Sequence, residues 1–557
     1  MSVPVPRLLL SVLIAAQLAA CSSGAPVAEP PLAERADAAL ASPALSAPPP
    51  AVAPAAAPPA RPMATGKVAH AVARRPAMPS LMAAPMPMPV PDQPSNERYG
   101  QISDNPIHRV AEAPVSTFSV DVDTGSYSNV RRLLNGGALP PADAVRVEEL
   151  INYFPYDYAL PTDGRPFAVH TALAPAPWNA QRVLLRVAIK GQDVAKQSLP
   201  PANLVFLVDV SGSMDSADKL PLLRSSLKLL VDQMRPVDRI SLVTYAGSTQ
   251  VVLAPTSGAD KATIKTAIDG LRAGGGTAGA SGIELAYRAA QQSFIDGGIN
   301  RILLATDGDF NVGVSDTEQL KKMVEAKRRS GISLSTLGFG TGNHNEALME
   351  QIADVGDGAY SYVDNLMEGH KVLVSEMSST LATIAKDVKV QIEFNPALVQ
   401  EYRQIGYENR QLRREDFHND QVDAGDIGAG HTVTALYELT LTGARGAIDP
   451  LRYGAAVRAG DERPGELANE LAHLRLRYKL PGQSSSELME TPIRRDAMKP
   501  LAQADADFRF ATAVAGFGQV LRGGRYTGEW TVADARKLAA ASLGEDRFGY
   551  RGEFLRL

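Results

Sequence analysis

The 557-residue sequence predicts an α/β protein built around a mostly parallel β-sheet that carries helices on both faces. Between about residues 203 and 386, short apolar runs alternate regularly with amphipathic segments of helical period, the pattern of a sheet wrapped on both sides. From Val388 onward the sequence changes to short stretches in which polar and apolar residues alternate, which indicates a β-rich domain, expected to be a sandwich. A chain of this length is expected to contain several domains.

The first segment, residues 1–20, has the features of a secretion signal. Arg7 precedes an apolar stretch at residues 8–16, and small residues lead into Cys21. The stretch is too short to span a bilayer comfortably, so we expect cleavage before Cys21. The pattern resembles a bacterial lipoprotein signal, which implies that Cys21, the only cysteine, is lipidated; a cleaved signal that leaves a free thiol is the alternative. Ser22 resembles the outer-membrane sorting pattern, so we expect a lipid-anchored cell-envelope protein on the periplasmic face of the outer membrane.

Residues 21–95 are dominated by alanine and proline and contain almost no aromatic residues. Such a composition buries too little apolar surface to offset the entropy of ordering the chain. We therefore expect a disordered tether. At about 3.1 Å per residue in the polyproline II conformation, it would reach about 200 Å at full extension.

The next segment, residues 96–200, flanks the central domain. It is expected to contain a strand and turn over residues 118–127, a helix near residues 147–153 and a strand at residues 182–189. Asp121 and Asp123 alternate with valines, so their carboxylates share one face of the expected strand, where a cation could sit. A solvated strand face is the simpler interpretation.

The central domain covers residues 201–386. Its expected strands are 204–208, 239–245, 250–253, 302–305, 333–337 and 359–363, and its expected helices are 219–234, 261–271, 280–292, 317–329, 345–355 and 367–384. The β-rich domain follows at residues 387–485, with strands expected at 389–394, 401–407, 431–441 and 471–478. Residues 486–557 are expected to form a helical tail, with helices at 505–521 and 532–543.

The most informative motif is a D-x-S-x-S loop at the end of the first expected strand of the central domain. Asp209, Ser211 and Ser213 place one carboxylate and two hydroxyls within five residues. Thr277 adds a hydroxyl after a run of glycines, and Asp307 adds a carboxylate after the expected strand 302–305. Hard divalent cations prefer oxygen ligands, and α/β folds place ligands at the carboxyl edge of the sheet, so this set predicts a metal site there.

In order and approximate spacing, these five residues resemble the metal-ion-dependent adhesion site of von Willebrand factor A (VWA) domains. The resemblance implies a Rossmann-like VWA domain and Mg²⁺, with Mn²⁺ or Ca²⁺ as possible substitutes. It further implies that the three hydroxyls contact the ion directly, that the aspartates act mostly through water, and that an acidic group of a partner completes the coordination. Residues 118–127, 405–410 and 423–431 resemble the flanking regions of a bacterial VWA lipoprotein family.

The sequence lacks the motifs that would indicate an enzyme. It contains no H-E-x-x-H or G-x-S-x-G motif and no P-loop lysine in the glycine turn before Thr277. His344 and His431 have no partner nearby in the sequence that would make them catalytic bases. The net charge of −5, with acids and bases well mixed, does not indicate a nucleic-acid surface.

We therefore expect a protein that binds an acidic residue of a protein partner through its metal site and performs no catalysis. The alternative is an envelope assembly or stress-response scaffold in which an acidic residue of the flank, such as Asp121 or Asp123, occupies the metal from within the same chain. These two hypotheses differ in where the last ligand comes from. A ligand from the same chain should make metal binding tight without a partner, and Asp121→Asn should weaken that binding.

Overall fold

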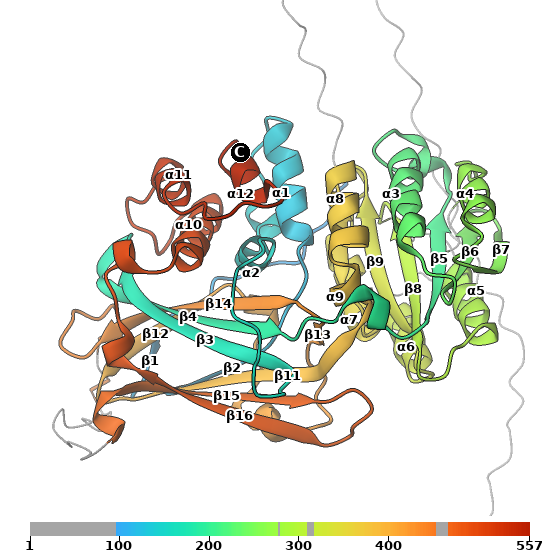
Figure 1. Cartoon of the computed structure of the whole chain (residues 1–557). Helices are drawn as coiled ribbons and strands as arrows, with labels where there is room; N and C mark the ends of the chain where they lie inside the picture. Colours follow the sequence, from blue (N-terminus) through green and yellow to red (C-terminus); the bar gives the residue numbers. More distant parts are fainter. Residues whose placement is uncertain (1–95, 277–278, 309–316, 450, 453–465) are drawn as a thin grey trace, which may run out of the picture. The chain divides into compact units, whose positions relative to one another are not determined.

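The structure is a computed structural model that describes residues 96–276, 279–308, 317–449, 451–452 and 466–557. The expected signal peptide, Cys21 and the expected tether lie outside the described residues, as does Thr277. The described chain forms three β-sheets and the helices that cover them (Figure 1).

The central sheet has six strands in the order β10-β9-β8-β5-β6-β7. All neighbours are parallel except the edge strand β7, which runs antiparallel to β6. The prediction of a mostly parallel sheet is confirmed. The strands are β5 (Ala202–Asp209), β6 (Arg239–Tyr245), β7 (Thr249–Ser257), β8 (Ile299–Thr306), β9 (Ser333–Phe339) and β10 (Tyr360–Val363).

Helices cover both faces of this sheet because its buried strands are apolar on both sides. In β5, Leu204 and Phe206 pack with α3, α4 and α9, whereas Val205 and Leu207 pack with α5, α6 and α7. The helices are α3 (Leu220–Gln233), α4 (Lys261–Asp269), α5 (Gly279–Gln292), α6 (Thr317–Arg328), α7 (Glu346–Val355), α8 (Leu366–His370) and α9 (Met377–Leu381).

The single helix expected at residues 367–384 was wrong. A π-helical turn (Lys371–Ser375) separates α8 from α9, and the chain enters strand β11 at Thr383. Within the turn, the ammonium group of Lys371 is buried against Glu376 at 2.7 Å and lies 4.3 Å from the ring centroid of Tyr153. The first residues of β11 were expected to continue the helix, but they pair with other strands instead.

The remaining two sheets form a sandwich. One sheet has the order β1-β12-β14-β4-β3, and the other has the order β13-β11-β15-β16 with β2 beside β11. Valine, leucine and aromatic side chains of both sheets share one core. The strands are β1 (His108–Arg109), β2 (Val115–Ser119), β3 (Phe167–Ala176), β4 (Asn179–Gly191), β11 (Thr383–Phe394), β12 (Val399–Ile405), β13 (Ile427–Gly428), β14 (Thr432–Leu441), β15 (Glu470–Lys479) and β16 (Ser486–Arg494).

The flank and the C-terminal region build this sandwich together. The flank supplies β1 to β4, and the C-terminal region supplies β11 to β16, so that β4 pairs with β14 and β2 pairs with β11. The central domain is thus inserted between β4 and β11. Strand β3 was not expected from the sequence, and β16 lies in the segment expected to be helical. In β16 only Met489 and Ile493 are buried, which gives a weak period-two signal.

A layer of helices covers the outer face of the β4–β14 sheet, where Leu184 and Leu436 join its core (Figure 1). These helices come from both ends of the described chain. They are α1 (Gly125–Asn135), α2 (Val147–Asn152), α10 (Ala506–Leu521), α11 (Val532–Ala540) and α12 (Tyr550–Phe554).

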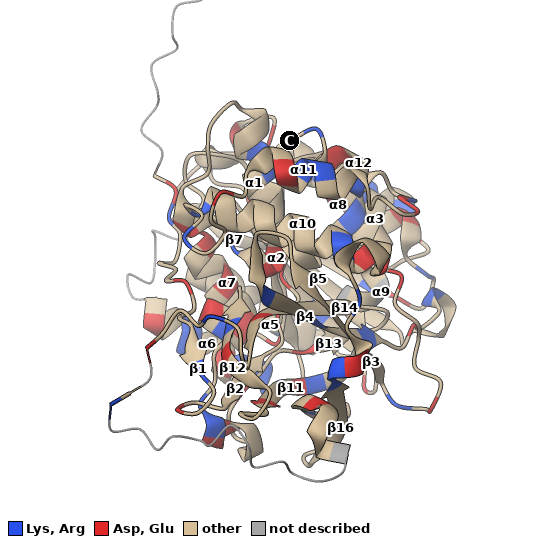
Figure 2. Cartoon of the chain, turned by 90° about the vertical axis from the view of Figure 1, so that its left-hand side faces the viewer, with Lys and Arg blue, Asp and Glu red and all other residues tan. Residues whose placement is uncertain are grey.

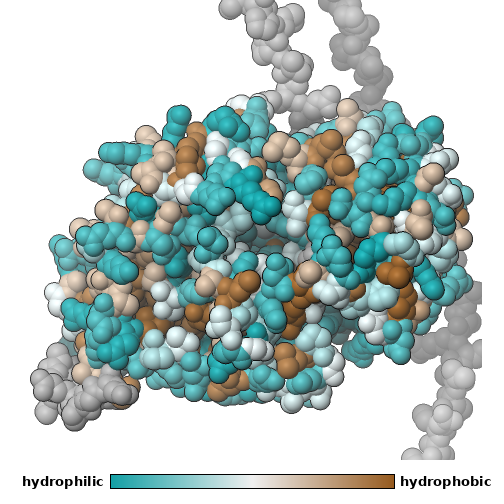
Figure 3. All heavy atoms as spheres, viewed as in Figure 1, coloured by the Kyte–Doolittle hydropathy of each residue, from teal (hydrophilic) through white to brown (hydrophobic). Residues whose placement is uncertain are grey.

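Figure 2 shows basic and acidic residues interspersed along the chain on the side that it draws. On the face seen in Figure 1, Figure 3 shows hydrophobic residues in small groups between hydrophilic ones. Within the part of the chain that the structure describes, no helix combines the length and the apolar character needed to cross a bilayer.

Candidate metal-binding site

Asp209 is the last residue of β5 and is fully buried. The backbone N–H of Ser211 donates to its Oδ1 at 2.8 Å, and the hydroxyl of Thr306 donates to its Oδ2 at 3.0 Å. Burial raises the pKa of Asp209 to about 6, and the nearby carboxylate of Asp307 adds to this rise, whereas the hydrogen bonds from Ser211 and Thr306 oppose it. Both carboxylate oxygens are therefore fixed in orientation at the carboxyl edge of the sheet.

The two serine hydroxyls lie next to each other. Ser211 Oγ and Ser213 Oγ are 3.0 Å apart. The glycine turn before Thr277 supports their loop, because Gly212 N donates to Gly275 O at 3.0 Å and Gly274 N donates to Val210 O at 2.8 Å. The glycine turn is therefore placed beside the serine hydroxyls, as the predicted site requires, while Thr277 itself lies outside the described residues.

Asp307 reaches the same place from the neighbouring strand. β8 is parallel to β5 and pairs with it up to Val208, so both strands end at one edge of the sheet. Gly308 follows in the left-handed region with φ of 94°, and a Cβ there would lie 2.5 Å from the backbone nitrogen of Asn345. Only glycine fits this turn. The structure thus brings together four of the five expected ligands: Asp209, Ser211, Ser213 and Asp307.

A lysine that the sequence analysis did not identify shares this site. The ammonium group of Lys219, just before α3, lies 2.9 Å from Oδ2 of Asp307 and donates to the carbonyl oxygen of Ser213 at 3.0 Å. Both side chains are buried, with exposed fractions of 7% for Lys219 and 1% for Asp307. The pair therefore is no ordinary surface ion pair, and Lys219 places a positive charge inside the candidate metal site.

The chain makes room for this lysine at one glycine. Gly340, directly after β9, has φ of 74°, and a Cβ there would approach the Cγ, Cδ and Cε atoms of Lys219 to between 2.2 and 2.7 Å. Any other residue would displace the aliphatic part of the lysine side chain. The position of Lys219 is thus fixed by packing as well as by charge.

The donor set fits a hard divalent cation. Two adjacent hydroxyls and two buried carboxylates at one edge are oxygen ligands of the kind that Mg²⁺ and Mn²⁺ prefer, and no thiol or imidazole intrudes among these described side chains. The residues that would hold the ion are Ser211, Ser213 and the two aspartates. The one competing feature is Lys219, which already supplies positive charge to Asp307.

The flank aspartates do not reach this site, so the hypothesis that they supply its last ligand is wrong. Asp121 and Asp123 both pair with Arg410, at 3.0 and 3.2 Å. Asp123 also accepts a hydrogen bond from the backbone of Tyr360 at 2.8 Å. Tyr360 begins β10, three strands from β5, which is about 14 Å at the usual strand spacing. Both carboxylates are buried, so the expectation of a solvated strand face was wrong as well.

His344 is a buried structural residue. Its Nε2 and the hydroxyl of Tyr360 are 3.0 Å apart, and burial lowers the pKa of His344 to about 4. Since histidine in an unfolded chain has a pKa of about 6.5, the unfolded chain takes up the proton first as the pH falls. The stability that neutral His344 contributes above about pH 6.5 is therefore lost progressively toward about pH 4.

We expect His344→Gln to reduce the fall in melting temperature between about pH 7 and pH 5. Glutamine can keep a hydrogen bond to Tyr360 but does not titrate. Thermal melts of both proteins at the two pH values measure this difference, because contributions of other titrating groups are common to both. The same fall in both proteins would mean that His344 does not contribute to the pH dependence.

Comparison with known proteins agrees with this geometry. A model of the von Willebrand factor type A domain matches residues 203–375, a model described as the C-terminal region of the uncharacterized protein YfbK matches residues 379–557, and a model described as von Willebrand factor matches residues 93–186. The uncharacterized protein YfbK of Escherichia coli (strain K12) is 53% identical over 471 residues, which cover 83% of this chain and 81% of that protein. The chain belongs to the YfbK family of bacterial VWA proteins.

The expected resemblance to a bacterial VWA family and the expected VWA fold are thus confirmed. This YfbK-family protein also resembles the 60 kDa subunit of magnesium chelatase from Rhodobacter capsulatus, with 33% identity over 28% of the chain and 29% of that subunit. Among solved structures, a von Willebrand factor type A protein from Catenulispora acidiphila aligns with a TM-score of 0.40 and 17% identity over 72% of the chain and 91% of that protein.

The three matching family models name no enzyme family, and the role of this YfbK-family protein is of the protein-interaction or adhesion type. Sequence reasoning missed two side chains at its site, Thr306 and Lys219. Thr306 is the last residue of β8 and directly precedes Asp307, so its place in the sequence could have indicated that its hydroxyl lies at the site. Lys219 could not, because nothing in its sequence neighbourhood shows that its side chain turns back toward Asp307.

Proposed function

We propose that this protein is lipid-anchored in the cell envelope through Cys21 and binds a protein partner through a divalent-metal-dependent adhesion site. The observation that carries the proposal is the convergence of Asp209, Ser211, Ser213 and Asp307 at one edge of the VWA sheet. Thr277, which follows the glycine turn, is the proposed fifth ligand. The Cys21 anchor rests on the signal pattern in the sequence.

The chain's own residues prepare the site for an acidic partner. Backbone and hydroxyl donors hold Asp209 so that it cannot turn away from the loop. The two serine hydroxyls are uncharged, so the site carries less negative charge than one built from carboxylates. A divalent cation held there would keep strong attraction for an incoming carboxylate of a partner. Apart from its two carboxylates, which are proposed to hold the ion, no group that could activate water contacts the serines among the described residues, which favours binding over hydrolysis.

Lys219 takes up two oxygens at the place where a cation would bind. Its ammonium neutralises Asp307 and occupies the carbonyl oxygen of Ser213. In this state Asp307 is less available as a ligand. We infer that the lysine lowers the affinity of the site for cations, so that occupancy depends on how much cation and acidic partner are present.

The experiment that tests the function uses Ser213→Ala in the full chain. Among the described residues, the Ser213 hydroxyl forms one side-chain hydrogen bond, with Ser211 Oγ, so the variant should fold. We expect Mg²⁺ binding, measured by isothermal titration calorimetry, to weaken at least about tenfold, since one charged-group contact is worth about 1.5–3 kcal/mol. Proteins retained from detergent-solubilised envelope by the unmutated chain with Mg²⁺ should be lost with EDTA and with the variant.

Ser216→Ala is the matched control, because Ser216 is an exposed serine of the same loop that bonds to Asp218. It should bind Mg²⁺ and the same proteins as the unmutated chain. Normal Mg²⁺ binding by Ser213→Ala would remove the serine from the site. Normal Mg²⁺ binding by the unmutated chain, together with an unchanged set of retained proteins in EDTA, would show that the ion does not mediate the partner contact.

A further inference from the structure

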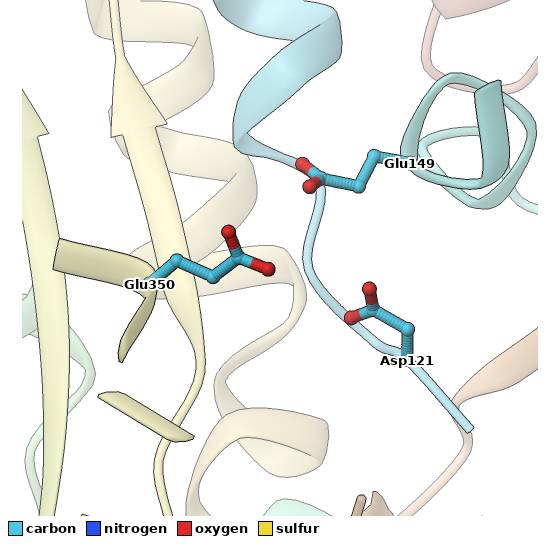
Figure 4. Close-up of side chains that lie close together, drawn as sticks. All are labelled: Asp121, Glu149 and Glu350. Carbon is cyan, nitrogen blue, oxygen red and sulfur yellow. The ribbon is translucent and has the colours of Figure 1, made fainter. Parts of the chain in front are cut away.

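A second cluster of oxygen ligands lies where the central domain meets the flank. Asp121 follows β2, Glu149 belongs to α2 and Glu350 belongs to α7, and one carboxylate oxygen of each lies within 4.8 Å of the others. Figure 4 shows the three carboxylates pointing toward one another. All three residues are buried, with exposed fractions of 4%, 1% and 4%. The cluster therefore is not a chance grouping of acids on the surface.

The charges around this cluster do not balance. Two arginines face it: Arg146 lies between 2.9 and 3.6 Å from three carboxylates, and Arg410 lies between 2.7 and 3.2 Å from four. Because Glu350 is shared, these are six carboxylates. The side chain of Asp354 is 38% exposed, so five are buried, an excess of three negative charges over the two arginines if all are ionised. The carboxylates are those of Asp121, Asp123, Glu149, Glu346, Glu350 and Asp354. Burying unpaired charge is strongly unfavourable, so this excess calls for a further cation or for protons.

One oxygen of the cluster has no hydrogen bond. Glu149 Oε2 accepts from the backbone N–H of Ser126 at 2.8 Å, whereas Oε1 accepts no hydrogen bond although it is buried. Arg146 Nε lies 3.4 Å from this oxygen and itself makes no hydrogen bond. Leaving such an atom unsatisfied costs about 1–3 kcal/mol, and more when it is charged. Figure 4 shows the Glu149 carboxylate directed at the other two.

We propose that Asp121, Glu149 and Glu350 bind a divalent cation of the size of Ca²⁺. The three oxygens lie close enough together for one ion to contact them all, since two ligands on opposite sides of Ca²⁺ lie about 4.8 Å apart. The burial of the cluster favours Ca²⁺ over Mg²⁺, since Mg²⁺ gives up its water reluctantly. A cavity of about 80 Å³ reaches the cluster at Asp121 and Arg410.

The electrostatics of Glu149 agree with this assignment. Burial raises the pKa of Glu149 well above its usual range, and the nearby carboxylate of Asp121 raises it further. Both effects reflect negative charge that the two arginines leave uncompensated. Protonation of the carboxylates would also remove this negative charge. In that case, added Ca²⁺ would neither bind nor raise the melting temperature.

The position of the cluster gives the ion a structural role. Its ligands come from the segment after β2, from α2 and from α7, so one ion would join the inserted VWA domain to the flank. Binding of a ligand to the folded state alone stabilises that state. The ion would therefore strengthen the attachment of the VWA domain independently of the adhesion site, which lies at the carboxyl edge of β5 and β8.

The test uses the full chain carrying Ser213→Ala, so that the adhesion site contributes less to cation binding. After removal of metals with EDTA, equilibrium dialysis with Ca²⁺ should show one bound ion per chain, and Ca²⁺ should raise the melting temperature by several degrees. Adding Glu149→Gln should remove both effects. The matched control is Glu438→Gln, a buried carboxylate outside the cluster that pairs with Arg403 at 2.7 Å, and it should keep the bound ion.

Two outcomes would overturn the proposal. In one, Ca²⁺ neither binds nor raises the melting temperature of the chain with an intact cluster, which would mean that protons balance the charge. In the other, Ca²⁺ binding persists in Glu149→Gln and also in Asp121→Asn. The melting experiment on the intact cluster needs no cluster variant, so it decides the matter even if these variants fold poorly. Loss of Mg²⁺-dependent partner binding in Ser213→Ala would remain interpretable in either case.

Discussion

Replacing Arg131 with methionine should lower the free energy of unfolding by about 3–5 kcal/mol, the cost of removing one partner from a buried ion pair. Arg131 is 1% exposed and belongs to α1 of the flank. Its guanidinium donates to Asp364 and lies 2.7 Å from Glu368, both in the VWA domain, and 2.9 Å from Glu553 in α12. One side chain therefore connects three parts of the fold.

The size of the effect follows from what the substitution leaves behind. Methionine fills much of the space of arginine but supplies no charge, so the side chains of Asp364 and Glu368, 5% and 1% exposed, would remain buried without their cation. Tyr153, whose hydroxyl accepts from Arg131 at 2.8 Å, still donates to Glu368 at 2.7 Å but cannot neutralise it. Urea denaturation of the variant and the unmutated chain measures the difference.

Arg329→Met provides the matched control. Arg329 pairs with Glu325 at 3.4 Å on the surface of the VWA domain and is 77% exposed. Such exposed pairs contribute roughly 0–1 kcal/mol, so this variant should unfold close to the unmutated chain. Equal losses of unfolding free energy in both variants would show that the buried network at Arg131 stabilises the protein no more than an exposed ion pair does.

The repeating parts of the fold could be predicted because their signals are local. Strands buried on both faces, such as β5 and β8, are continuous apolar runs, and the amphipathic helices between them have a clear period. The arrangement of these strands in one mostly parallel sheet is then what the resemblance to VWA domains implies. The positions of the candidate ligands Asp209 and Asp307 could be predicted for a related reason, since Asp209 ends such a run and Asp307 directly follows one.

The sandwich could be predicted only in part because its pairing is between distant segments. Strand β4 pairs with β14 and β2 with β11 across the whole inserted domain, and no local pattern specifies such partners. Edge strands such as β3 and β16 are partly exposed, which weakens the period that would identify them. Buried ion clusters were missed for the same reason: Arg410 and Asp121 lie 289 residues apart in the chain.

Replacing Lys219 with methionine should raise the Mg²⁺ affinity of the adhesion site by about ten- to a hundredfold. The estimate follows from the contact that a cation must now disrupt: a hydrogen bond to a charged group contributes about 1.5–3 kcal/mol, and every 1.4 kcal/mol is a factor of ten. In the variant, Asp307 loses its ammonium partner at 2.9 Å and Ser213 O loses a donor at 3.0 Å. Calorimetric titration with Mg²⁺ measures the change.

Lys219→Arg separates charge from packing in this prediction. Arginine keeps a positive charge near Asp307, so its Mg²⁺ affinity should stay at or below that of the unmutated chain. If methionine does not change the Mg²⁺ affinity, breaking the contact between Lys219 and Asp307 costs no free energy, and the lysine does not regulate the site. If methionine weakens binding, the lysine instead holds the Ser213 loop in its binding conformation through the carbonyl oxygen. A tighter site with methionine alone would identify Lys219 as the built-in competitor of the cation, because the arginine variant keeps the positive charge that methionine lacks.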